Sequence, residues 1–128
     1  MNQENSNYIT LQDLEVYILS RELSTSAWVI YQSLEKGLKW GIGQQFIRSI
    51  DSIGANIAEG YGRFHYLDKV RFYYNARGSY FESMDHWLEL LFQRNLVLES
   101  EFNRLKEIGK ELQIKLNFLI KATKSKAN

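Results

Sequence analysis

The chain has 128 residues, of which 45% are hydrophobic and 24% are charged, with a formal net charge of +1 and no cysteine. This length is that of one ordinary domain and is sufficient to bury a core without a metal or a disulfide. The lack of cysteine excludes disulfides, thiolate metal sites and thiol nucleophiles. The near-neutral net charge excludes a strong overall attraction to nucleic acid or anionic lipid, so any such attraction must be local.

Residues 1–10 are polar and are expected to form a disordered N-terminal segment. They contain no basic stretch followed by an apolar one, so we expect no secretory signal and a cytoplasmic location. Charged residues interrupt the apolar runs, and no membrane-spanning segment is expected. The lack of proline and the recurrence of apolar residues at three- and four-residue steps predict an all-α domain over residues 11–122, followed by a Lys-rich tail over residues 123–128.

The first two helices are predicted over residues 11–36 and 44–59. Thr10 is the candidate N-cap of the first helix, and three glycines between the helices mark a turn that reverses the chain. In the second helix, Phe46, Ile50, Ile53 and Ile57 are spaced four, three and four residues apart, as in a core seam. The expected buried face of the first helix consists of Leu11, Leu14, Ile18 and Trp28.

Two further helices are predicted, one over residues 65–95 and one from about Ser100 onward. Gly60 and Gly62 favour a left-handed ending of the second helix, and Ser100 is the candidate N-cap of the fourth. The short connections between four long helices favour an antiparallel up-down-up-down four-helix bundle.

The third predicted helix carries more apolar surface than one bundle can bury. Its core seam, interrupted only by Arg77, is expected to consist of Val70, Tyr74, Phe81, Met84, Leu88 and Leu91. A second aromatic stripe beside it recurs every seven residues and is made of Tyr66, Tyr73, Tyr80 and Trp87. Because aromatic side chains dominate the energetics of protein interfaces, we expect this stripe to meet another subunit. Alternatively, the tyrosines lie at the edge of the monomer core with their hydroxyls in water.

Small and polar residues gather between the second and third predicted helices. The small ones would allow close approach of the two backbones: Gly54, Ala55, Ala58 and Gly60 facing Ala76, Gly78 and Ser79. The polar ones are Asn56, Glu59, Arg63, Arg71, Asn75 and Glu82. They form either a ligand or catalytic pocket or a hydrogen-bonded network that fixes helix register, and the network is favoured because no nucleophile, metal set or phosphate loop accompanies them.

Other signals of chemistry are absent from the sequence. His65 and His86 are the only histidines, and neither lies at metal-ligand spacing from a second ligand. The glycine-containing turns lack the strand-before-helix context of a phosphate loop. We therefore expect no enzymatic activity, no metal, no cofactor and no small-molecule substrate.

Basic residues become more frequent in the fourth helix and tail, where seven Lys and Arg residues accompany four glutamates. Repeated around an oligomer, such a surface would attract the phosphates of RNA or DNA. Alternatively, it is a solvated face that complements the helix dipole. The candidate nucleic-acid contacts are Lys106, Lys110, Lys121, Lys124 and Lys126.

Residues 45–63, with the sequence QFIRSIDSIGANIAEGYGR, are followed by Phe72, by Ala-Arg-Gly-Ser at residues 76–79 and by Glu82. This pattern resembles the four-helix-bundle family encoded by intervening sequences in bacterial 23S rRNA genes, which also includes the accessory variability determinant of diversity-generating retroelements. The resemblance covers most of the chain, from Leu14 onward. It implies a bundle that assembles into a homopentameric ring without known enzymatic activity; the accessory protein is basic and binds nucleic acid and a reverse transcriptase.

Together, these patterns favour a non-enzymatic, homo-oligomeric helical scaffold whose positive surface contacts RNA or DNA. The alternative is a protein–protein interaction and assembly module without affinity for nucleic acid. Steep weakening of binding with salt would indicate phosphate contacts and would distinguish the two.

Overall fold

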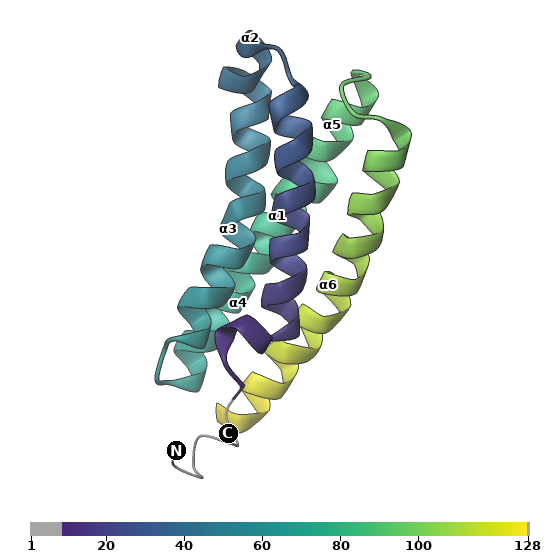
Figure 1. The fold of residues 1–128 in the computed structure, drawn as a ribbon. Coiled ribbons are helices and arrows are strands. Elements are labelled where there is room, and N and C mark those ends of the chain that lie inside the picture. Colours follow the sequence, from purple (N-terminus) through teal and green to yellow (C-terminus); the bar gives the residue numbers. More distant parts are fainter. Residues whose placement is uncertain (1–8, 128) are drawn as a thin grey trace.

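The computed structural model describes residues 9–127, and these form an all-α fold without a strand. Figure 1 shows long helices packed side by side, with the chain running alternately up and down between the two ends of the molecule. The prediction of an antiparallel up-down-up-down bundle is therefore confirmed for the single chain. Of the segment predicted to be disordered, residues 1–8 lie outside the described residues.

The first helix, α1, spans Glu15–Ser33 and is preceded by a 3-10 turn at Leu11–Asp13. The hydroxyl of Thr10 donates to the Asp13 carboxylate at 2.8 Å and makes no bond to the backbone. The expected N-cap role of Thr10 is therefore wrong.

The buried face of α1 also differs from the expected one. Ile18 and Trp28 are exposed, and Leu11 and Leu14 are only half-buried. The stripe that faces the core has an apolar residue at nearly every turn. The stripe expected from Leu14 and Ile18 instead continues in mid-helix with Arg21 and Thr25, which are polar. The buried apolar residues of α1 are Val16, Leu19, Leu23, Ala27 and Ile30.

The second rod of the bundle is α3 (Gln44–Tyr61), which is preceded by a short helix α2 (Lys36–Leu38) and by a segment at Lys39–Gly43 that is kinked at Gly41. The chain leaves α1 through Leu34 and Glu35, which are extended, and bends again at Gly41, whose backbone is non-helical with φ −101° and ψ −109°. The predicted glycine turn is therefore confirmed at Gly41. Gly43 is buried, and a Cβ there would lie 2.8 Å from the Leu34 side chain. Glycine at this position allows the turn to fold closely against the helix.

The four apolar residues predicted as the core seam of α3 are confirmed, since all of them are fully buried. The left-handed helix ending predicted after α3 is wrong, because Gly62 has a φ of −79° and ends the helix in ordinary right-handed geometry. Lys69 instead donates a hydrogen bond to the carbonyl of Tyr61 at 2.7 Å. Gly60 is required for a different reason, since a Cβ there would lie 2.6 Å from the ring of Tyr73.

The third rod consists of α4 (Tyr66–Tyr80), a π-helical segment at Phe81–Trp87 and α5 (Leu88–Gln93). It agrees with the helix predicted over residues 65–95. The seam predicted for it is confirmed at Val70, Met84, Leu88 and Leu91, which are buried. It is wrong at Tyr74 and Phe81, which are exposed, because the wider winding of the π segment changes which face points inward.

The fourth rod is the single helix α6, Glu99–Ala127. The carboxylate of Glu101 accepts a hydrogen bond from the backbone N–H of Leu98 at 3.0 Å, so the helix begins before Ser100, which is not its N-cap. The prediction that a tail begins at residue 123 is also wrong, because α6 continues to Ala127. Ile120 and Thr123 continue the buried stripe of α6 to its last turn and hold it against the bundle.

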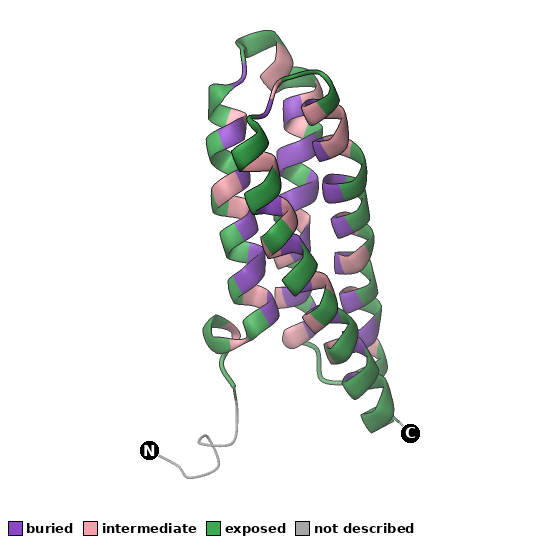
Figure 2. Cartoon of the chain, turned by 90° about the vertical axis from the view of Figure 1, so that its right-hand side faces the viewer, coloured by how far each residue is buried: buried purple, intermediate pink, exposed green. Residues whose placement is uncertain are grey.

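The core lies along the axis between the rods, and Figure 2 shows the buried residues on their inward sides. The predicted contact of small residues between α3 and α4 is formed only in part: Gly60 approaches α4 closely, but Gly54 and Gly78 do not lie where they were predicted. A Cβ at Gly54 would be 2.9 Å from the hydroxyl of Ser20 on α1, whereas a Cβ at Gly78 on α4 would meet nothing. The close approach of small residues in mid-bundle therefore joins α3 to α1, where the Ser24 hydroxyl also donates to Asp51 at 2.6 Å.

Candidate nucleic-acid interface

The aromatic stripe predicted as an oligomer interface is buried at its centre. Tyr73 and Tyr80 are only 3% and 5% exposed within the single chain. Burial raises the pKa of each hydroxyl to about 12, with a smaller contribution from Tyr61 at Tyr73 and from Asp85 at Tyr80. The prediction that these two tyrosines face another subunit is therefore wrong, because the core of the chain already encloses them.

The ends of the stripe remain accessible. Tyr66 is exposed, and Trp87 is half-buried with its indole nitrogen donating to the Glu82 carboxylate at 2.9 Å. The third rod has further exposed aromatic surface at Tyr74 and Phe81, which are 41% and 42% exposed. The exposed aromatic surface inferred from the sequence therefore lies partly on another face of the third rod, at Tyr74 in α4 and at Phe81 in the π-helical segment.

The predicted polar network between α3 and α4 is not formed. Arg63, in the loop after α3, pairs with Glu59 of α3 at 2.8 Å, and Asn56 donates to a carbonyl of its own helix. Within residues 9–127, no hydrogen bond joins the α3 members to Arg71, Asn75 or Glu82 on the third rod. The guanidinium of Arg63 instead lies 4.7 Å from the ring centroid of Phe72, a cation–π contact that links the helices.

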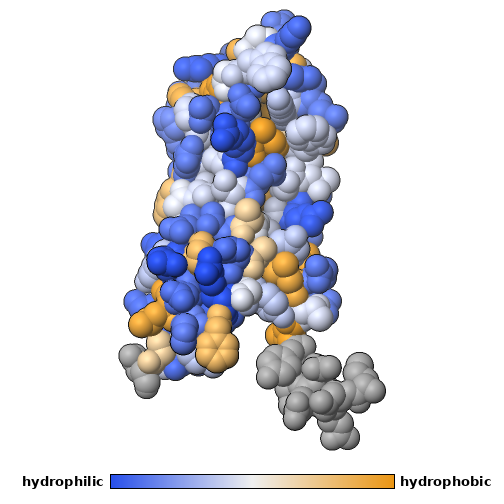
Figure 3. Space-filling model, turned by 90° about the vertical axis from the view of Figure 1, so that its left-hand side faces the viewer, coloured by the Kyte–Doolittle hydropathy of each residue, from blue (hydrophilic) through white to orange (hydrophobic). Residues whose placement is uncertain are grey.

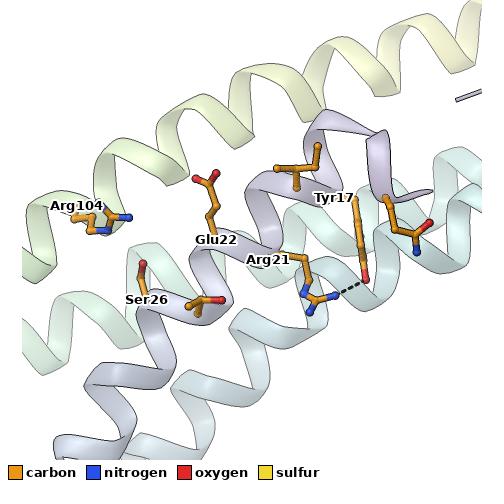
Figure 4. A pocket seen from close by; sticks show the side chains of 8 residues that line it. Tyr17, Arg21, Glu22, Ser26 and Arg104 are labelled. Carbon is orange, nitrogen blue, oxygen red and sulfur yellow. Dashed lines mark hydrogen bonds between the residues drawn. The ribbon is translucent and has the colours of Figure 1, made fainter. Parts of the chain in front are cut away.

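A cavity of about 450 Å³ lies between α1 and the start of α6. Figure 4 shows Arg21 turned toward Tyr17, to whose hydroxyl it donates at 3.0 Å, and away from Arg104. The Glu22 carboxylate lies in the same lining. Because its guanidinium groups diverge and a carboxylate accompanies them, the arrangement does not favour a bound anion.

The lysines predicted to contact nucleic acid are separated in the structure. Lys106 donates to the carbonyl of Met84 at 2.9 Å and pairs with Glu89 at 2.8 Å and with Asp85 at 3.6 Å. Its charge is thus compensated by two carboxylates, which argues against the predicted contact with nucleic acid. Lys110 is exposed but lines no cavity among those described.

Two further cations of α6, Lys121 and Lys124, meet α4 in a groove of about 360 Å³, which we call the basic groove. The ammonium of Lys124 lies 3.2 Å from the Tyr74 hydroxyl and 5.7 Å from the centroid of its ring. No carboxylate lines the groove, so its positive charge is not neutralised locally. The lining residues are Tyr74, Arg77, Asn117, Ile120, Lys121 and Lys124.

The positive region extends beyond the groove to the end of α6. Burial, and then the charge of nearby Lys126, lower the pKa of Lys69 at the start of α4. The structure thus brings Lys121 and Lys124 of the predicted set together with Arg77, and it places Lys126 near Lys69. Sequence reasoning missed Arg77 as a functional residue, although its charge in an apolar seam was the available signal.

Other kinds of functional surface on the described residues would be an apolar face, a metal site or a membrane-spanning helix. On the side where α3 lies, Figure 3 shows apolar areas separated by hydrophilic ones and not joined into one continuous face. Residues 9–127 contain no group of three or more His, Cys, Asp and Glu side chains placed to hold a metal ion. No helix in the described part of the chain has both the length and the apolar character needed to cross a membrane.

Comparison with known proteins identifies the family. Residues 12–118 match the family described as 23S rRNA-intervening sequence protein. The chain is also similar to the crystal structure of a protein with unknown function from the S23 ribosomal protein family of Bacteroides thetaiotaomicron, with a TM-score of 0.75 and 24% identity over 81% of this chain and 96% of that one. At that identity the likeness shows the fold alone, and among curated proteins none matches the chain. Because the family match spans most of its length, the chain belongs to the 23S rRNA-intervening sequence protein family, as the resemblance of residues 45–63 predicted.

Proposed function

We propose that this chain is a non-catalytic, cytoplasmic helical scaffold that assembles with copies of itself and binds the phosphates of RNA or DNA in the basic groove. The observation that carries the proposal is the convergence of Arg77, Lys121 and Lys124 on a groove with no carboxylate in its lining. A guanidinium fits phosphate oxygens in a bidentate manner, and ammonium groups add point charges beside it. Such contacts fix a nucleic-acid backbone without reading its sequence.

Assembly would make this groove effective. One copy carries a formal net charge of only +1, so the field of a single chain is local and is screened within about 8 Å at physiological salt. Several copies would present several grooves to one strand, and each contact after the first would benefit from a high effective concentration. The homopentameric ring implied by the family resemblance is the assembly we propose.

The proposal is tested by fluorescence anisotropy with a labelled RNA oligonucleotide across a salt series. About three phosphate contacts for each groove predict that log affinity falls against log salt with a slope of about −2. The variant Arg77→Gln/Lys121→Gln/Lys124→Gln should bind at least tenfold more weakly at low salt, with a slope near zero.

The matched control is Lys36→Gln/Arg48→Gln/Arg94→Gln, which removes the same charge from exposed positions outside the groove. It should retain both the affinity and the salt slope of the parent chain. Equal losses in the two triple variants would show a nonspecific effect of net charge and would contradict a binding groove. Absence of RNA and DNA binding at low salt would overturn the proposal.

A second candidate function, assembly without nucleic acid, is favoured by the groove on the other side of α6. That groove, of about 240 Å³ between α1 and α6, is lined by Glu15, Ile18, Leu19, Glu22 and Glu111. Lys115 pairs with Glu15 and with Glu111, which leaves Glu22 to give this acidic groove a charge opposite to that of the basic groove. One copy could therefore place its acidic groove against the basic groove of the next. Nucleic acid would then compete with assembly, whereas in the leading proposal it would bind without releasing subunits.

A further inference from the structure

An alternation of aromatic rings and cations follows one face of α4 beside the basic groove. Tyr74, Arg77 and Phe81 are spaced three and four residues apart, so their side chains lie along a single helical face. The two rings are exposed, which leaves room for a flat ligand group to contact them.

Each ring also has a positive group close to it. The ammonium of Lys124 lies 5.7 Å from the ring centroid of Tyr74, and the guanidinium of Arg77 lies 5.9 Å from that of Phe81. An exposed ring beside a cation is suited to a ligand that carries both a π face and a negative charge. A nucleotide has both, in its base and its phosphate.

The spacing of the rings favours unpaired bases. Seven residues of helix separate Tyr74 and Phe81, which corresponds to about 10.5 Å along the axis. The step between bases in B-DNA is about 3.4 Å, and those bases are already stacked on one another. A ligand that places bases on both rings must therefore have a backbone free of duplex stacking.

We propose that the basic groove binds single-stranded RNA or DNA, with Tyr74 and Phe81 stacking on unpaired bases while Arg77, Lys121 and Lys124 hold the phosphates between them. This inference rests on the proposed function and specifies its ligand. A duplex offers the same phosphates to the groove but no free base faces to the rings. Single strands should therefore bind more tightly than duplexes of equal length.

The test compares a labelled 12-nucleotide single strand of thymidines with a 12-base-pair DNA duplex, both measured by anisotropy at low salt. Tyr74→Leu and Phe81→Leu keep an apolar side chain but remove the ring. Each should lower the single-strand affinity about tenfold, within the range found for loss of base stacking, and leave the duplex affinity unchanged. Tyr74→Phe keeps the ring and should retain single-strand binding to within about twofold.

Trp28→Leu, at an exposed tryptophan on α1 away from the groove, is the matched control and should change neither affinity. Equal affinity for the two ligands, with no effect of the leucine variants, would overturn the single-strand inference and leave phosphate binding in place. Failure of both ligands to bind would remove the proposed function itself. Circular dichroism of each variant excludes unfolding as the cause of a loss.

Discussion

At the scale of single residues, Lys106 has a structural task in place of the nucleic-acid contact expected for it. It lies opposite the end of the π-helical segment Phe81–Trp87, where the N–H of Leu88 donates to the carbonyl of Ser83 instead of to that of Met84. A π segment shifts backbone hydrogen bonding by one residue in this way, and the carbonyl left over needs another donor. The ammonium of Lys106 supplies one to Met84 at 2.9 Å.

Replacing this lysine should therefore destabilise the fold. Lys106→Met keeps an apolar stem but removes the donor to Met84 and the pairing with Glu89, and we expect a loss of about 1–2 kcal/mol because the group is partly solvated. The measurement is urea unfolding followed by circular dichroism. Lys110→Met, one turn further along α6 and exposed, should change the free energy of unfolding by less than about 0.5 kcal/mol. Equal unfolding midpoints for the two variants would show that the π segment does not depend on Lys106.

At the scale of elements, α4 buries Tyr73 and Tyr80 in the core and leaves Tyr74 exposed. The ordinary pKa of the hydroxyls of Tyr73 and Tyr80 is 10.0, and burial raises it to about 12 because the phenolate cannot be solvated there. The folded state thus holds these protons to higher pH than the unfolded state. The resulting stability is complete below pH 10 and is lost as the pH rises from 10 to about 12.

This linkage predicts alkaline sensitivity. At pH 11 each buried tyrosine should lower the free energy of unfolding by about 1.4 kcal/mol relative to pH 9, since one pKa unit corresponds to about 1.36 kcal/mol. Tyr73→Phe/Tyr80→Phe should show a smaller decrease by about 3 kcal/mol in urea titrations at the two pH values. Lysines also titrate in this range, so Tyr74→Phe, at an exposed ring, is the control and should keep the full decrease. The same decrease in both proteins would contradict the burial of Tyr73 and Tyr80.

At the scale of the whole molecule, the number, order and approximate bounds of the helices could be predicted, because they depend on local periodicity and on breaks in it. The inward faces were harder to predict. The seam of α3 was recognised because Phe46, Ile50, Ile53 and Ile57 have no competing stripe. On α4, where aromatics surround the helix, the π segment decided which ring faced inward, and no local pattern specified it.

The basic character of the candidate site could be predicted, but the particular residues that form it could not. The sequence indicated basic residues on α6, and the structure retained Lys121 and Lys124 because they meet α4. Lys106 does not belong to the basic groove, because it pairs with two carboxylates of the third rod that are distant in sequence. Arg77 joined the site because tertiary packing places it across from α6. Pairings between helices depend on their relative rotation, which the periodicity of each helix alone does not determine.

The two grooves beside α6 make self-assembly testable by charge. Contacts between two different patches are heterologous, and they close into a ring when the rotation between copies permits it. If copies join by the acidic and basic grooves, Glu22→Lys or Lys121→Glu should shift the mass measured by light scattering toward the monomer at low salt. The double variant Glu22→Lys/Lys121→Glu should restore assembly, because it exchanges the charges and keeps them complementary.

Glu35→Lys, at the exposed turn before α2, makes the same charge change outside both grooves and should leave the mass unaltered. Assembly that persists in both single variants would place the contact elsewhere and leave the basic groove free for nucleic acid. Assembly lost in the single variants and regained in the double would mean that the groove is occupied by a neighbouring copy, and strands would then have to displace that copy to bind. A parent chain that is monomeric at every concentration would contradict self-assembly through any surface.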